Sequence, residues 1–141
     1  MRLKIKKTAS YKFSKKYLDL ISESKVYDVA ERTPITFASN LSSKLKNDVY
    51  LKREDMQPIF SFKIRGAYNK IANLSIQQQR RGVMTASAGN HAQGVANACK
   101  KLKVPCFIVM PVTTPEIKVK SVKKSFLSSG VPPIFTISRA T

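Results

Sequence analysis

The sequence predicts an α/β fold built on a parallel sheet. Two apolar runs, residues 83–85 and 106–110, have the composition of short buried strands, and a stretch with helical spacing of apolar residues follows each. Such alternation implies right-handed crossovers between parallel strands, with ligands bound at the carboxyl ends of the strands. At 141 residues with 43% hydrophobic content, the chain is long enough for one modest domain of this class.

The first half of the chain predicts four helices and one short strand. We expect helices over residues 14–22 and 39–45 and a strand over residues 49–52. Ser61 has the residue type of an N-cap, and the helix after it carries one apolar stripe: Ile64, Ala67, Tyr68, Ile71 and Leu74. Ser75 and Gln78 form a capping box that opens a short helix, which Gly82 ends.

The second half alternates strand and helix. The strand at 83–85 turns at Ser87-Ala88-Gly89 into a helix over residues 91–102, whose predicted core stripe is Ala92, Val95, Ala96, Cys99 and Leu102. The strand at 106–110 ends at Pro111. Thr114 and Pro115 then supply an N-cap and a first-turn proline for a helix that runs to residue 124.

The segment Ser61-Phe62-Lys63-Ile64-Arg65-Gly66-Ala67 places a lysine in the first turn of a helix. A cation there opposes the positive end of the helix dipole, and we expect Lys52, Arg53 and Arg65 nearby, so the amine should lose its proton more readily than a surface lysine does. A lysine that forms a Schiff base requires this property. We interpret Arg65 itself as a solvated charge on the helix surface.

The segment Ser87-Ala88-Gly89-Asn90-His91 is a turn of small residues that opens a helix. The backbone N–H groups of such a turn are unpaired, and hydroxyl and amide side chains lie beside them, so the turn is a receptor for a carboxylate or a phosphate. His91 is the only histidine. At a helix start we expect it to contribute its backbone N–H and a supporting hydrogen bond rather than to act as a general base.

Both segments resemble the N-terminal part of biosynthetic threonine dehydratases, which are fold type II pyridoxal phosphate enzymes. The resemblance runs from about residue 17 to residue 123. Besides the two segments above, it includes Val26-Tyr27-Asp28-Val29-Ala30, Thr33-Pro34, Leu51-Lys52-Arg53-Glu54-Asp55-Met56-Gln57-Pro58, Ile108-Val109-Met110-Pro111 and Ile117-Lys118-Val119. So many blocks in the same order make a chance match very improbable.

The resemblance implies a site, a cofactor and a reaction. Lys63 would hold pyridoxal 5'-phosphate covalently, Phe62 would pack against its ring, and Asn90 would hydrogen-bond the ring hydroxyl. Ser87, Gly89, Asn90 and His91 would bind the substrate carboxylate. The reaction would convert L-threonine, and L-serine more slowly, to a keto acid and ammonia, in isoleucine biosynthesis for threonine. Related serine racemases carry a second serine where this chain has Ala88, so dehydration is favoured over racemisation.

The resemblance ends near residue 124. The family continues into a Gly-Gly turn and a further strand, whereas this chain reads Ser125-Phe126-Leu127-Ser128-Ser129-Gly130 and stops at Thr141. The family's glycine-rich phosphate loop has no counterpart, since the five glycines are all isolated. We expect residues 1–55 to belong to the large domain, 56–124 to the cofactor-proximal small domain and 125–141 to be a divergent tail. The fold would then be incomplete and this truncated chain inactive, with a homo-oligomer formed only by a full-length enzyme.

Two alternatives remain, an inert remnant of a decayed or frameshifted gene and a basic nucleic-acid-binding protein. The formal charge is +18, and seven of the eight acids lie between Asp19 and Asp55. A charge this high attracts nucleic acid nonspecifically. However, no recognised nucleic-acid-binding motif accompanies the lysine clusters at 100–103 and 118–124, so we expect no specific nucleic-acid partner.

The remaining composition points to a cytoplasmic protein. There is no apolar run of about 18 residues that could span a bilayer, so we expect no membrane association. The spacing of Cys99 and Cys106 suits neither a metal knuckle nor a redox pair. We therefore expect buried reduced thiols and no metal site.

Overall fold

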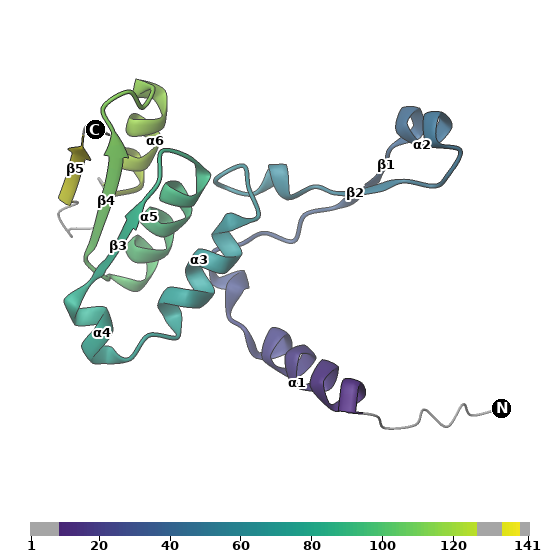
Figure 1. Ribbon diagram of the computed structural model, residues 1–141, viewed down its shortest axis with the longest axis horizontal. Coiled ribbons are helices and arrows are strands. Elements are labelled where there is room, and N and C mark those ends of the chain that lie inside the picture. The colour runs from purple at the N-terminus through teal and green to yellow at the C-terminus, as the bar shows by residue number, and fades with distance from the viewer. Residues whose placement is uncertain (1–8, 127–133, 139–141) are drawn as a thin grey trace.

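The computed structural model describes residues 9–126 and 134–138, with side chains over residues 14–124. Its α/β body contains a three-stranded parallel sheet in the order β3 (Val83–Ala86), β4 (Cys106–Pro111) and β5 (Ile134–Ser138) (Figure 1). The helices α5 (Asn90–Leu102) and α6 (Glu116–Phe126) connect these strands. This arrangement confirms the predicted parallel α/β fold.

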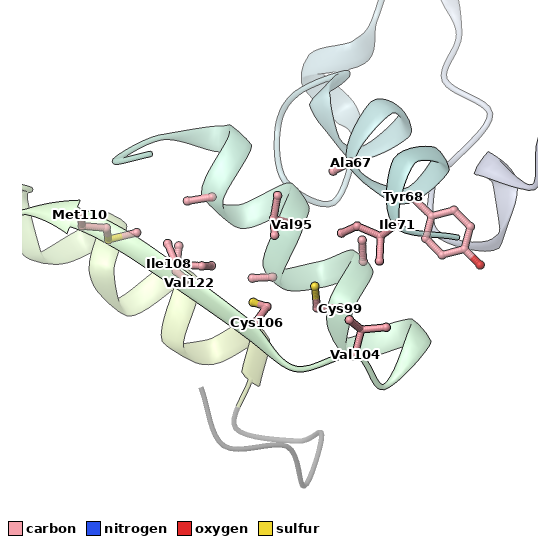
Figure 2. Close-up of a cluster of buried hydrophobic side chains, with 13 residues drawn as sticks. Ala67, Tyr68, Ile71, Val95, Cys99, Val104, Cys106, Ile108, Met110 and Val122 are labelled. Atoms are coloured by element: carbon pink, nitrogen blue, oxygen red, sulfur yellow. The ribbon is translucent and has the colours of Figure 1, made fainter. Parts of the chain in front are cut away.

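Side chains alternate along β4 between a buried and a more exposed face. Cys106, Ile108 and Met110 are buried, and they pack with the buried residues of α5 and with Val122 of α6 (Figure 2). The predicted stripe of α5 is confirmed, because four of its members are buried and Leu102 packs against the same cluster. Cys99 and Cys106 are free thiols inside this core, as expected. The hydrogen bond to Cys106, together with burial, raises the pKa of the Cys99 thiol.

Helix α3 (Lys63–Ala72) packs against α5, and its predicted stripe is also confirmed. Ile64, Ala67, Tyr68 and Ile71 are buried. The Tyr68 hydroxyl donates a hydrogen bond of 2.6 Å to a carboxylate oxygen of Asp28, which holds the short 3-10 helix η1 (Val26–Asp28) against α3. Burial and this carboxylate raise the pKa of Tyr68 to about 12.

Helix α4 (Ile76–Arg81) has the predicted capping box. The Gln78 N–H donates to Ser75 Oγ at 3.2 Å, and the Ser75 N–H donates to Gln78 Oε1 at 2.9 Å. Gly82 follows as the C-cap with φ of +84°. This left-handed conformation explains why a glycine ends the helix.

A long arm extends from the α/β body (Figure 1). It consists of β1 (Ile35–Phe37), the helix α2 (Ser39–Leu45) and β2 (Tyr50–Lys52), with β1 and β2 antiparallel. Helix α2 has the predicted bounds and β2 begins one residue later than predicted, whereas β1 was not predicted. All residues of both strands are exposed, so β1 lacks the buried apolar pattern by which strands are detected.

Two further elements differ from prediction. Helix α1 (Ala9–Glu23) begins at Ala9 rather than at residue 14. The strand β5 lies within residues 125–141, where the sequence had suggested a tail without a further strand. Ile134-Phe135-Thr136-Ile137 consists of residue types enriched in strands, and it pairs in parallel with the edge of β4. The assignment of residues 1–55, 56–124 and 125–141 to separate domains stays a prediction.

The two glycines at positions 66 and 82 make a matched test of this geometry. A Cβ atom at Gly82 would lie 2.7 Å from the Pro105 carbonyl oxygen in a residue with positive φ, whereas a Cβ at Gly66, inside α3, meets nothing within 4 Å. We expect Gly82→Ala to lower the free energy of unfolding by about 1–3 kcal/mol. Gly66→Ala should raise it by about 1 kcal/mol through helix propensity. Urea denaturation of both variants measures these changes, and equal signs would contradict the assignment.

Candidate active site

Lys63 is the first residue of α3 and is exposed. Phe62 occupies the N-cap position without a side-chain cap, and the Ser61 hydroxyl accepts the Lys63 N–H at 3.3 Å. Ser61 was predicted as the N-cap itself, so the helix begins one residue later than expected while its hydroxyl still serves the first turn. Phe62 is 63% exposed, so its side chain is accessible to a planar ligand.

Asn90 opens α5 beside the loop that leads to Lys63. Its amide Nδ2 donates to the Phe60 carbonyl oxygen at 3.5 Å. Farther along α5, a Cβ at Gly94 would lie 3.3 Å from the Lys63 carbonyl oxygen, so the two helix backbones are nearly in contact there. The structure thus brings Phe62, Lys63 and Asn90 to one place at the start of α3 and α5.

The predicted carboxylate-binding turn follows the carboxyl end of β3. The Ser87 N–H donates to the Val109 carbonyl at 3.0 Å, and Ser87 Oγ accepts the Gly89 N–H at 3.2 Å. The Gly89 donor is therefore already paired, and the first N–H groups of α5 are the remaining candidates for a carboxylate. His91 is exposed and lines a cavity of about 460 Å³ that also borders Gly66 and Thr85.

Arg65 is not the solvated helix charge that the sequence suggested. Its Nε donates to Glu54 Oε2 at 2.8 Å and its Nη2 to Glu54 Oε1 at 2.9 Å, which is a bidentate pair. The Arg65 and Glu54 side chains are only 23% and 17% exposed. Arg65 also stacks on the Tyr27 ring at 5.2 Å. The prediction was wrong because it relied on the usual exposure of arginine side chains, whereas the partner of Arg65 lies 11 residues away in the sequence.

Glu54 is the centre of a wider polar network that sequence reasoning missed. Thr33 Oγ1 donates to Glu54 Oε1 at 2.7 Å. Gln57 is buried, and its side chain pairs with both backbone groups of Glu31 at 2.9 Å. Gln57 Nε2 also donates to the Glu54 carboxylate. These hydrogen bonds attach the segment before Lys63 to residues 31–33. The only sequence signal for the network was that Thr33, Glu54 and Gln57 lie in blocks that resemble the family.

The cations expected beside Lys63 have other partners. Arg53 forms a salt bridge of 2.7 Å with Asp55, and the Lys52 ammonium donates to the Thr33 carbonyl. Arg65 is bound to Glu54, so both arginines are paired with carboxylates, and the Lys52 ammonium is bound to a backbone carbonyl.

The residues present fit one side of pyridoxal phosphate. Lys63, Phe62 and Asn90 supply an amine, a ring face and an amide on adjoining elements. The phosphate requires a cluster of backbone N–H groups, for which glycine runs are typical, and the sequence has only isolated glycines. The chain therefore fits the aldehyde and ring of the cofactor better than its phosphate.

Residues 26–125 match the family model for pyridoxal-phosphate dependent enzymes. The chain belongs to this family. It is 57% identical over 107 residues to the biosynthetic L-threonine dehydratase of Burkholderia multivorans, a match that covers 76% of this chain and 21% of that protein. It is 59% identical over 108 residues to the chloroplastic biosynthetic threonine dehydratase 1 of Solanum lycopersicum, covering 77% of this chain and 18% of that protein.

The solved structure of processed threonine deaminase isoform 2 from Solanum lycopersicum has the same fold. It superposes with a TM-score of 0.81 at 45% identity, over 95% of this chain and 35% of that chain. The fold is thus that of a fold type II enzyme, and the chain spans about a fifth of the length of the curated relatives it matches. Among the described residues, no helix has the length and apolarity needed to cross a membrane.

The Glu54 network makes the free energy of unfolding depend on pH in the acid range. The hydrogen bond from Arg65 is the main cause that lowers the pKa of Glu54 from 4.5 to about 2. A depressed carboxylate pKa contributes stability that is fully present above pH 4.5 and is lost as the pH falls towards 2. The contribution has an upper limit of about 3 kcal/mol.

We therefore expect Glu54→Gln to destabilise the chain at pH 6 and to lose most of that effect near the folded-state pKa of about 2. Asp55→Asn is the matched control, because its pair with Arg53 is exposed and should change stability little. Unfolding curves across this pH range test the claim. A constant difference between wild type and Glu54→Gln at every pH would contradict it.

Proposed function

We propose that this chain carries the lysine-bearing half-site of a threonine dehydratase, which converts L-threonine to 2-oxobutanoate and ammonia. The observation that supports this best is the packing of α3 against α5, which puts the Lys63 carbonyl beside Gly94 and bonds Asn90 to the loop before Lys63. The identity to threonine dehydratases over this region supports the same substrate.

Lys63 would hold pyridoxal 5'-phosphate covalently through Nζ. When bound, the cofactor supplies an electron sink for the carbanion that forms at the substrate Cα. Phe62 would lie against its ring. Asn90 Nδ2 has two hydrogens, and because one points to the Phe60 carbonyl, the other is free to bond the ring hydroxyl.

The substrate carboxylate would lie at the turn formed by Ser87, Gly89, Asn90 and His91. The positive end of α5 and its first N–H groups favour an anion there. The substrate amine would first replace Lys63 Nζ on the cofactor, and the freed Lys63 amine would then accept the Cα proton while the hydroxyl group leaves the neighbouring carbon. Ala88 offers no group to return a proton from the opposite face, so racemisation is disfavoured.

The proposal includes L-serine as a slower substrate, a cytoplasmic location, a place in isoleucine biosynthesis and a homo-oligomer for a full-length enzyme. The chain by itself would lack the phosphate-binding part of the site. An inert remnant of a decayed gene is the alternative, and it predicts no activity even after the remainder of a family enzyme is supplied.

Joining residues 1–124 to the part of tomato threonine deaminase beyond the matched region tests the proposal. Borohydride reduction of this chimera with cofactor, followed by peptide mapping, should place the label on Lys63. Lys63→Ala should abolish release of 2-oxobutanoate, whereas Lys70→Ala, about two turns further along α3, should retain it. Label on another lysine would refute the assignment.

The 141-residue chain alone should not bind the cofactor tightly. Without a backbone N–H cluster, the phosphate dianion meets only exposed lysines, each worth about 1 kcal/mol or less. Titration with pyridoxal phosphate should give no saturable absorption band of covalently bound cofactor and no keto acid from threonine. A saturable band that Lys63→Ala removes, together with turnover, would show that the chain is an enzyme by itself.

A further inference from the structure

Strand β3 is an edge of the parallel sheet. Among the described strands it pairs with β4 alone. The Val83 N–H donates to the Pro105 carbonyl at 2.9 Å, so the odd-numbered residues of β3 face the β4 side. The backbone groups of Met84 and Ala86 therefore point to the opposite side, where no described residue pairs with them. They form an open template for a further strand.

This edge lacks the features by which proteins block the addition of a strand. Natural edge strands are protected by lysine, by proline or by a bulge. The segment Val83-Met84-Thr85-Ala86 has no charge and no proline, and its residues pair one to one with β4 without a bulge. Met84 is 74% exposed. The whole length of β3 is thus accessible to a partner strand.

An apolar groove lies beside the same edge. It is the cavity of about 460 Å³ that His91 lines, and we call it the β3 groove. Residues of β3, α3 and α5 contribute its apolar side chains, which are Ala67, Ile71, Leu74, Val83, Met84 and Val95. A small apolar ligand would fill the groove only. An extended segment would fill it and also pair the backbone of β3, so the two features together select a peptide strand.

The charges at the β3 groove select an acidic partner. Lys70 and Arg81 line it, both are exposed, and neither forms an ion pair with a described carboxylate. No acid is among the described residues of the lining. The surrounding body has the same sign, since Glu116 is the only acid after Asp55. Repulsion disfavours a second copy of this basic body at the edge, whereas an acidic segment is attracted.

From these observations we propose that β3 and its groove bind an extended, acidic peptide segment of a partner protein. The segment adds a fourth strand to the three-stranded sheet. Its backbone pairs with Met84 and Ala86, its alternate apolar side chains enter the groove, and its acidic ends lie near Lys70 and Arg81. The interaction does not use Lys63 Nζ, so it is independent of the threonine chemistry proposed above.

A fluorescent synthetic hexapeptide with alternating valine and threonine and with glutamate at both ends tests the proposal on the full chain. Fluorescence anisotropy should show saturable binding, and hydrogen exchange of the Met84 and Ala86 amides should slow in the complex. N-methylation of every inner residue should weaken binding at least about tenfold, because the peptide then cannot donate to β3. Serine in place of valine should weaken it similarly, because the groove is apolar.

Variants of the chain test the same contacts. Met84→Pro removes one N–H from the free edge and leaves the bonds to β4, so it should weaken binding about fivefold, whereas Met84→Leu should not. Lys70→Gln with Arg81→Gln should weaken binding about fivefold at low salt. Lys44→Gln with Lys46→Gln removes the same charge from the arm at α2 and should leave binding unchanged.

Several results would overturn the proposal. Equal losses in the two charge pairs, or full affinity of the serine peptide, would show adsorption to a basic chain rather than strand addition. Full affinity of the N-methylated peptide, or unchanged exchange at Met84 and Ala86, would exclude backbone pairing. Occupation of β3 by a second copy of the chain, measured by sedimentation and by protection of the same amides without peptide, would replace the proposed partner.

Discussion

The close approach of α3 and α5 is the constraint on which the candidate site depends. Gly94 makes it possible, because a side chain there would press on the Lys63 carbonyl and on Ile59 at 3.3 Å and on Ala67 at 3.4 Å. Lys63 and Asn90 belong to the first turns of these two helices. Their relative position is therefore set by backbone packing rather than by flexible side chains, which suits a site that must orient a ligand.

The second support of Lys63 comes from the opposite direction, through its own preceding loop. Glu54 and Gln57 fasten this loop to residues 31–33, and Arg65 closes the network from α3 itself. Every hydrogen bond of this network involves a charged group or a backbone group. Removing one side chain would therefore leave the other polar groups unpaired where they are only partly accessible to water. The network and the helix contact together hold the first turn of α3 from both sides.

Short-range sequence patterns predicted the features that depend on neighbouring residues. The apolar stripes of α3 and α5, the capping box at Ser75 and the stop at Gly82 depend on residues a few positions apart, and all were recovered. The Glu54–Arg65 pair was missed because its members are distant in sequence and share no periodic pattern. Strand β1 was missed because all of its residues are exposed, and β5 was missed because it lies beyond the resemblance, although its residue types favour a strand.

The two thiols in the core give the chain an internal reporter of its own opening. Cys99 on α5 and Cys106 on β4 are the only cysteines, and they are 1% and 2% exposed (Figure 2). An alkylating reagent can reach them only when helix and sheet separate, and it reacts with the thiolate, which the raised pKa of Cys99 makes scarce. The rate of thiol labelling under native conditions consequently measures how often α5 and β4 separate by local unfolding, without any engineered probe.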